Sequence, residues 1–183
     1  MTAQVPGGCQ HLLVPRYHEQ DCVPSFAMIG GLVFVPFTGP LFEVLFGSDD
    51  HGGGSDVFMP GHLADNLGAF KEQEGQQLVL LLRILTHDVN VGYYSSGSIK
   101  ALQAVNGEKI KNMEHLVKYL HSGTKGEEYL RFRFGTRGSL DEESGEVIVL
   151  DRKAAFAAEA EILETHRIDA AVSKDLRDSS APS

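Results

Sequence analysis

The chain has 183 residues, of which 42% are hydrophobic, and its 16 Lys and Arg against 25 Asp and Glu give a net charge of −9. This length and apolar content predict one soluble globular domain with a proper core. The acidic balance argues against binding to nucleic acid or to an anionic membrane surface, since both repel the chain. The most apolar run, from Leu78 to Leu82, is far shorter than the ~20 residues of a membrane span.

The first 25 residues are interrupted by prolines and glycines and are expected to form an N-terminal arm or linker. They lack the basic region and apolar run of a secretory signal. Cys9 and Cys22 lie in this arm without any metal-binding spacing around them. We therefore expect two unpaired thiols in a reducing, intracellular compartment, although a disulfide closing a small loop is the alternative.

Residues 26–37 are nearly all apolar, with many β-branched and aromatic side chains, and they predict one buried strand that Pro36 and Pro40 end. The next segment, residues 41–46, predicts a short helix with its large apolar side chains turned inward. The same side chains exceed what one small sheet face needs, so they are also candidates for an interface with another subunit or a neighbouring domain. These interface candidates are Phe42, Leu45 and Phe46.

A glycine-rich loop follows this helix and suggests two specific functions, metal binding and phosphate binding. Its acidic residues and His51 are possible metal ligands, and the glycines before Ser55 are a possible phosphate cradle. Neither spacing is complete, because no glutamate closes a calcium loop and no Gly-Lys-Ser/Thr follows the glycines. We expect a solvated loop with no metal and no cofactor. The acidic candidates are Asp49, Asp50 and Asp56.

The remaining elements alternate along the chain. Helical spacing predicts helices over residues 61–73, 113–120 and 152–166, the last two capped by Asn112 and Asp151. Apolar or alternating runs predict strands over residues 77–85, 129–134 and 147–150. Asn106-Gly107, the dipeptide that most readily forms a type I′ turn, predicts a hairpin before the second of these helices. About five strands and four helices, mixed along the chain, indicate an α+β fold.

Four stretches in order resemble one known family. VNGEKIKNMEHLVKYL, from Val105 to Leu120, resembles the strand, turn and groove helix of a PDZ domain, and Ile29-Gly-Gly-Leu-Val-Phe34 resembles the glycine loop and groove strand. The strand from Gln77 and the closing segment from Glu146 to Leu176 are similar to plant-type Deg/HtrA serine proteases. The resemblance implies the C-terminal, second PDZ-like domain of such a protease, a small β-barrel or sandwich with flanking helices.

On this basis we expect an arm over residues 1–25, a PDZ-like domain over 26–176 with a helical insertion at 40–76, and a tail over 177–183. We expect a peptide site in which a strand edge at Leu32–Val35 offers unpaired amides to another chain, with capture of a free C-terminus at Ile29–Leu32 as the alternative. His115 falls near the position of a ligand-binding histidine, but a solvent-facing helix histidine is the simpler alternative. The peptide-site candidates are Ile29, Gly30, Gly31, Leu32, Val33, Phe34, His115 and Tyr119.

The chain is not expected to be a catalyst. It contains no Gly-Asn-Ser-Gly-Gly nucleophile motif, and 183 residues are too few for the paired protease barrels together with this domain. The sequence therefore predicts a non-catalytic protein-interaction or oligomerisation module of a protease that acts in protein quality control. Its expected partners are peptides, further copies of itself, or neighbouring protease and PDZ domains. By resemblance the compartment is the chloroplast, mitochondrion or nucleus. A hydrolase using His51 and Ser55 is the competing hypothesis.

Overall fold

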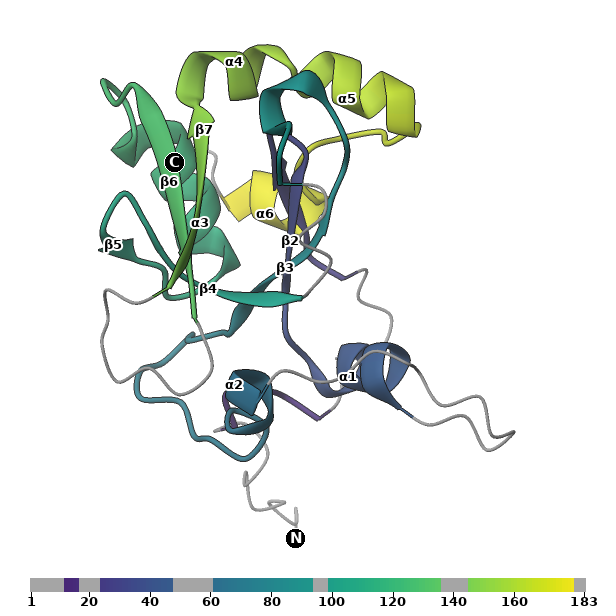
Figure 1. Cartoon of the computed structure of the whole chain (residues 1–183). Coiled ribbons are helices and arrows are strands. Elements are labelled where there is room, and N and C mark those ends of the chain that lie inside the picture. The colour runs from purple at the N-terminus through teal and green to yellow at the C-terminus, as the bar shows by residue number, and fades with distance from the viewer. Residues whose placement is uncertain (1–11, 17–23, 48–60, 94–98, 136–144, 180–183) are drawn as a thin grey trace, which may run out of the picture.

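The computed structural model describes residues 12–16, 24–47, 61–93, 99–135 and 145–179. Its centre is an antiparallel sheet of seven strands in the order β1-β2-β3-β4-β6-β7, with β5 paired to β4 (Figure 1). The sheet is open, with β1 and β7 at its two ends. The α+β class is confirmed, although the sheet has seven strands rather than about five. The strands are β1 (Ala27–Ile29), β2 (Leu32–Pro36), β3 (Val79–Ile84), β4 (Lys100–Val105), β5 (Glu108–Lys109), β6 (Tyr129–Phe134) and β7 (Glu146–Asp151).

Short helices flank this sheet, and two of the predicted N-caps are confirmed. Asn112 accepts the N–H of His115 at 2.8 Å, and Asp151 accepts the N–H of Ala154 at 2.7 Å. The α-helices are α1 (Gly39–Phe46), α2 (Gly61–Ala64), α3 (Met113–Lys118), α4 (Arg152–Ala157), α5 (Glu159–His166) and α6 (Lys174–Ser179). A 3₁₀ turn, η1 (Asp88–Asn90), and a π-helical turn, η2 (Tyr119–Gly123), complete the set.

Two helix predictions need correction. The helix expected over 61–73 stops at Ala64, because Asn66 and Leu67 donate to carbonyls only three residues back and Gly68 follows, so the chain turns. The helix expected over 152–166 is divided at Ala158 into α4 and α5. Helix α6 was not predicted at all.

The run from Phe26 to Phe37 was predicted as one strand, and this prediction is wrong. It is a hairpin, in which β1 pairs antiparallel with β2 and the chain reverses at Gly30-Gly31. These glycines have φ of 54° and 83°, the positive angles of a type I′ turn. Both strands are apolar on each face, so no alternation in the sequence marked where the first ends and the second begins.

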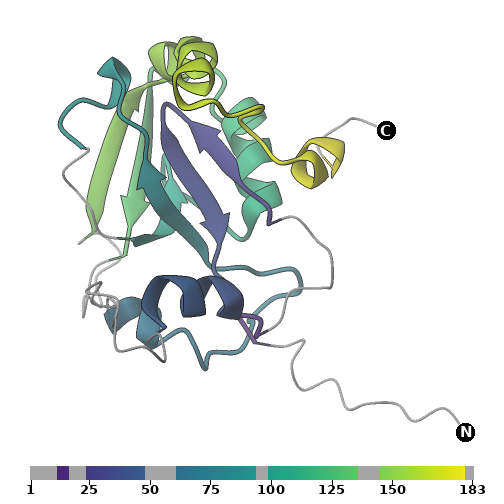
Figure 2. The same ribbon diagram turned by 90° about the vertical axis from the view of Figure 1, so that its right-hand side faces the viewer.

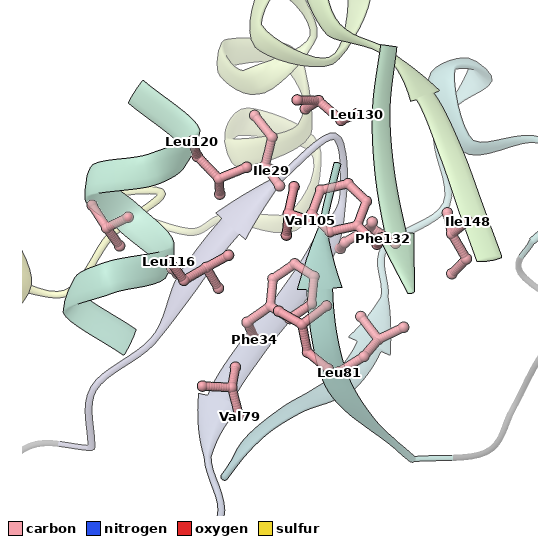
Figure 3. Close-up of a cluster of buried hydrophobic side chains, with 14 of the residues drawn as sticks. Ile29, Phe34, Val79, Leu81, Val105, Leu116, Leu120, Leu130, Phe132 and Ile148 are labelled. Atoms are coloured by element: carbon pink, nitrogen blue, oxygen red, sulfur yellow. The ribbon is translucent and has the colours of Figure 1, made fainter. Parts of the chain in front are cut away.

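Successive side chains of β2 point to opposite faces of the sheet and so enter different core clusters. Leu32 and Phe34 enter the main cluster, where Phe34 stacks on Phe132 with ring centroids 5.5 Å apart (Figure 3). Helix α3 covers this cluster. On the other face, Val35 packs in a second cluster beneath α1, and Val33 contacts a third cluster beneath α5. The hairpin β1–β2 is therefore buried from both sides.

The Asn106-Gly107 turn is confirmed, with φ of 47° and 85°. The Asn106 side chain ties it to β6, accepting the Arg131 N–H at 2.6 Å and donating to the Tyr129 carbonyl at 3.0 Å. Replacing Gly107 with valine should lower the free energy of unfolding by about 1–3 kcal/mol, because positive φ is strained for a β-branched residue. Urea denaturation followed by circular dichroism measures this loss, and an unchanged midpoint would contradict the strain.

Candidate functional site

The surface between the first strand and helix α3 is the place where this fold could accept another chain. We call it the β1–α3 groove; Ala27, Met28 and Ile29 line it from β1, and Val117, Leu120 and His121 from the helical side. Figure 3 shows Ile29 of β1 facing Leu120 across it. The space left between the two walls is only about 10 Å³. No more than one water molecule fits in such a volume, so the groove is closed.

The groove is closed by a distant part of the same chain, residues 171–179, which we call the strap. Figure 2 shows the strap descending from α5 beside β1 and ending in α6, next to α3. Val172 forms an antiparallel bridge with Ala27. On either side of this bridge, the Met28 N–H donates to the Ala171 carbonyl at 2.7 Å, and the Ser173 N–H donates to the Phe26 carbonyl at 3.0 Å. The strap thus extends the sheet beyond β1.

Side chains add to this pairing at both ends of the strap. Val172 contacts the walls of the groove, and Leu176, 7% exposed, belongs to the main core cluster. The buried hydroxyl of Ser173 accepts the Phe26 N–H at 3.1 Å, and the Ser25 hydroxyl donates to Asp175 at 2.6 Å. The strap is therefore held by two apolar contacts and a small polar cluster.

The pKa of Asp175 reflects this cluster. Partial burial raises this pKa, but hydrogen bonds from Ser173, Ser25 and backbone N–H groups favour the carboxylate and bring it below its ordinary value. A carboxyl group whose pKa falls on folding stabilises the folded state above its unfolded-state pKa, and this contribution is lost as pH falls through the folded-state pKa.

The variant Asp175→Asn tests this link. At neutral pH it should be less stable than the wild type, since the amide replaces a charged acceptor. The difference should shrink as the solution is acidified below the ordinary pKa of an aspartate. Thermal unfolding at pH 7 and at about pH 3 measures both values. A difference that stays the same at the two pH values would show that Asp175 contributes nothing through its charge.

The strand edge that faces α3 belongs to β1 and not, as expected, to β2. The strand edge at Leu32–Val35 was expected to offer unpaired amides to another chain, and this expectation is wrong, because β2 is paired with β1 on one side and with β3 on the other. The strand that faces α3 is β1, so Ile29 is the peptide-site candidate that lines the groove. A binding role for the residues of β2 remains a prediction.

The glycines of the expected carboxylate site lie in a buried turn. Gly30 lies against Leu150 and Ala155, and Gly31 lies against the Leu85 carbonyl and the Asn90 amide. Asn90, which is fully buried, donates to the carbonyls of Gly30 at 2.8 Å and Leu85 at 2.7 Å. Capture of a free C-terminus at Ile29–Leu32 also remains a prediction, and the burial of this turn does not favour it.

His115 and Tyr119 lie on a different side of the helix from the groove. His115 accepts the Lys111 N–H at 3.3 Å through Nδ1, and its Nε2 is 3.7 Å from the Glu108 carboxylate. Its ring contacts that of Tyr119, whose pKa is raised by burial and by the charges of Glu108 and Glu127. The histidine at the groove is instead His121. The sequence placed His121 on the solvent side of the predicted helix and did not show which side of this segment meets β1.

The three interface candidates lie on the predicted helix α1. Phe42 and Phe46 are half-buried, with ring centroids 5.9 Å apart, and they pack against the second core cluster; Leu45 is also half-buried. Val44 on the same helix is 81% exposed. We call these four residues the α1 patch. Its phenylalanines contribute to the domain's own core as well as to its surface.

A larger hollow, of about 460 Å³, lies between residues 72–78 and the β4–β5 hairpin. Its lining includes several glutamines together with Lys109 and Arg133, which already interact with other groups. None of the predicted site residues lines it. In the described part of the chain, no cluster of three or more His, Cys, Asp or Glu could hold a metal. The loop with His51 and Ser55 lies outside the described residues.

Comparison with known proteins agrees with this fold. The PDZ domain family matches residues 14–175, and the chain belongs to that family. It is 30% identical over 165 residues to the putative protease Do-like 3, mitochondrial, of Arabidopsis thaliana, covering 90% of this chain and 25% of the relative. It is 33% identical to protease Do-like 4, mitochondrial, of the same plant, covering 87% of this chain and 24% of the relative. It is 30% identical to protease Do-like 2, chloroplastic, also from this plant, covering 90% of this chain and 24% of the relative.

These similarities confirm the resemblance to a PDZ domain of a Deg/HtrA protease. The chain spans about a quarter of the length of these curated relatives. PDZ domains mediate interactions with proteins and peptides. Among the helices of the described segments, none is long and apolar enough to cross a membrane.

The strap is the functional feature that the sequence analysis missed. Its only local signal is the sequence Ala170-Ala171-Val172-Ser173, in which small residues and one β-branched residue precede a serine. Such a short segment is too weak a pattern to predict a strand. Its partner at Phe26 is 147 residues away along the chain, so only the folded structure shows the pairing.

Proposed function

We propose that the chain is a non-catalytic protein-interaction and oligomerisation module of a Deg/HtrA-type serine endopeptidase that acts in protein quality control. The observation that carries this proposal is the strand pairing at the outer edge of β1, where backbone groups already hold an extended segment. Strand addition of this kind is a common way for a domain to bind another chain. The names of the relatives support a mitochondrial or chloroplast location.

The α1 patch is the proposed surface for assembly. Val44 is 81% exposed on a helix whose other side chains, except that of Glu43, are apolar, and an aliphatic residue in this setting is stabilised when another subunit covers it. Docking on neighbouring domains of a protease would cover the patch equally well. Both alternatives predict that a charge at Val44 weakens association without disturbing the phenylalanines beneath it.

Sedimentation velocity over a range of concentrations tests this proposal. The wild-type chain should associate as concentration rises, and Val44→Asp should weaken that association by about tenfold or more, as expected for an interface anchor. Val91→Asp is a matched control, because Val91 is also an exposed valine (64%) but follows η1. The same preparations should leave unfolded casein intact.

A wild-type chain that stays monomeric at the highest concentration would contradict self-association. An equal effect of both aspartates would contradict the α1 patch as its site. Cleavage of casein by the purified chain would contradict the non-catalytic role.

A further inference from the structure

We propose that the strap is a displaceable occupant of the β1–α3 groove, and that the groove's partner is an internal, extended protein segment of similar chemistry. This inference rests on the proposed role as a protein-interaction module. In the closed form, the strap occupies the edge of β1. In the open form, the partner replaces it, adding its own strand to the same edge.

The edge of β1 is built for an added strand. The Ala27–Val172 bridge is a non-hydrogen-bonded pair, because the flanking bonds run from Met28 N–H to Ala171 and from Ser173 N–H to Phe26. The backbone groups that bond to the strap are thus the N–H of Met28 in β1 and the carbonyl of Phe26 just before it. Any extended segment of the same polarity finds these groups in the same places, whatever its origin.

The pairing of the strap is much shorter than the pairings inside the sheet. β6 pairs with β7 over six residues and β2 with β3 over five, whereas the strap contributes one bridge and two backbone hydrogen bonds. Helix α6 has six residues, of which Lys174, Asp175, Arg177 and Asp178 are exposed. The buried side chains of the strap are only those of Ala171, Ser173 and Leu176, and segments with few buried contacts open at a lower free energy than the whole domain. The strap is therefore expected to detach while the sheet remains folded.

The polarity of the strap and the length of its contacts together indicate an internal partner segment. The strap runs antiparallel to β1, so its amino-terminal side lies toward Gly30-Gly31 and its carboxyl side leaves beside Ser25. A partner of this polarity does not bring a free C-terminus to the glycine turn. The turn is also buried beneath Leu150 and Ala155. The strap's own contacts continue past the bridge to Asp175 and Leu176, so a segment that reproduces them continues beyond the groove at its carboxyl side as well.

The contacts of the strap define the residues that such a partner needs. Val172 lines the groove together with Ile29 and Leu120 and packs against their cluster, so the matching position takes a branched aliphatic side chain. The next position takes a serine or threonine, whose hydroxyl accepts the Phe26 N–H. An acidic residue two positions further accepts the Ser25 hydroxyl, as Asp175 does. The partner class is thus an internal segment with the pattern aliphatic, hydroxyl, any residue, acid.

Hydrogen exchange of the unmodified chain tests whether the strap opens. The amides of Met28 and Ser173 lie in the strap pairing, and the amide of Phe132 in the centre of the sheet is the reference. If the strap detaches alone, the first two should exchange at least about tenfold faster than the reference, after correction for intrinsic rates. Exchange of all three at the rate of global unfolding would overturn the displaceable strap.

A labelled synthetic peptide with the sequence of residues 168–179 tests the partner class by fluorescence anisotropy. Val172→Asp in the full chain places a charge in the closed groove and should release the strap. This variant should bind the peptide at least about tenfold more tightly than the wild type, whose own strap competes at high effective concentration. A peptide that carries the same Val172→Asp change should not bind.

A disulfide-locked chain provides the matched control. Ala27→Cys and Val172→Cys, in a chain with Cys9→Ser and Cys22→Ser, place two thiols at a non-hydrogen-bonded pair, where the Cα separation suits a disulfide. The oxidised form should not bind the peptide, and reduction should restore binding. Equal binding by both forms would overturn the groove as the site, even if Val172→Asp fails to fold.

Absence of binding to every form, combined with fast exchange of Met28 and Ser173, would overturn the partner class while retaining the detachable strap. These outcomes are independent of the sedimentation result, because the α1 patch and the β1–α3 groove lie on different elements. Failure of self-association would therefore contradict the assembly role alone.

Discussion

Replacing Gly31 with alanine should lower the free energy of unfolding by about 4 kcal/mol, combining the strain of a positive φ with overlap in a packed interior. Its φ is 83°, and a Cβ at this position would overlap the Leu85 carbonyl oxygen and the Asn90 side chain. Both groups belong to the hydrogen-bonded network that anchors the hairpin, so neither moves without losing a bond. Chemical denaturation followed by far-ultraviolet circular dichroism measures the loss.

Gly107→Ala is the matched control for this variant. Gly107 has nearly the same backbone angle, φ of 85°, but nothing lies within 4 Å of a Cβ built there. Its substitution carries the conformational strain without the overlap and should cost only about 1 kcal/mol. Equal losses in the two variants would contradict the close packing around the β1–β2 turn.

Replacing Asn90 with aspartate should cost about 3–5 kcal/mol at neutral pH, close to the cost of breaking a buried charged pair. Asn90 is fully buried; its amide donates to two carbonyls, and its oxygen accepts the His87 N–H at 3.1 Å. A carboxylate keeps only the last bond and faces two carbonyl oxygens. The protein should unfold at a clearly lower temperature than the wild type.

The pH dependence separates this electrostatic effect from a simple packing defect. Burial and the neighbouring carbonyls should raise the pKa of the introduced carboxyl above its unfolded-state value. The folded state then binds the proton more tightly, so the stability of Asn90→Asp should recover as pH falls from 7 to about 5. Asn90→Ala, which cannot titrate, should show no such recovery relative to the wild type. The same loss at both pH values in Asn90→Asp would contradict the electrostatic explanation.

Features that depend on neighbouring residues were predictable from the sequence. The Asn106-Gly107 turn requires only two residues with positive φ, and Asn112 and Asp151 cap helices through amides three residues away. The β1–β2 turn was missed for a local reason too. Both of its strands are buried on each face, so the apolar run from Phe26 to Phe37 continues through the turn without a polar break.

The candidate site could not be predicted from the sequence, because it is formed by contacts between residues far apart along the chain. Which strand edge faces α3 is decided by the position of β1. The side of the continuous α3–η2 segment that meets this edge distinguishes His121 of η2 from His115 of α3. The strap joins Phe26 to Ser173, 147 residues apart. Closing so long a loop costs conformational entropy, and the folded sheet between the two segments is what brings them together. Such a pairing is a property of the finished fold.

The strap also determines how the domain responds to mechanical force. Ser25 and Asp175 are hydrogen-bonded at 2.6 Å, so the segment that leads into β1 and the carboxyl side of the strap lie side by side. Tension applied between residues 24 and 179 loads the Ser25–Asp175 bond first, the Phe26–Ser173 contact second and the Met28–Ala171 contact third, one after another. This is an unzipping geometry, in which the bonds break in sequence and not together. A pull between these two residues would therefore peel the strap from β1 at low force and leave the seven-stranded sheet intact.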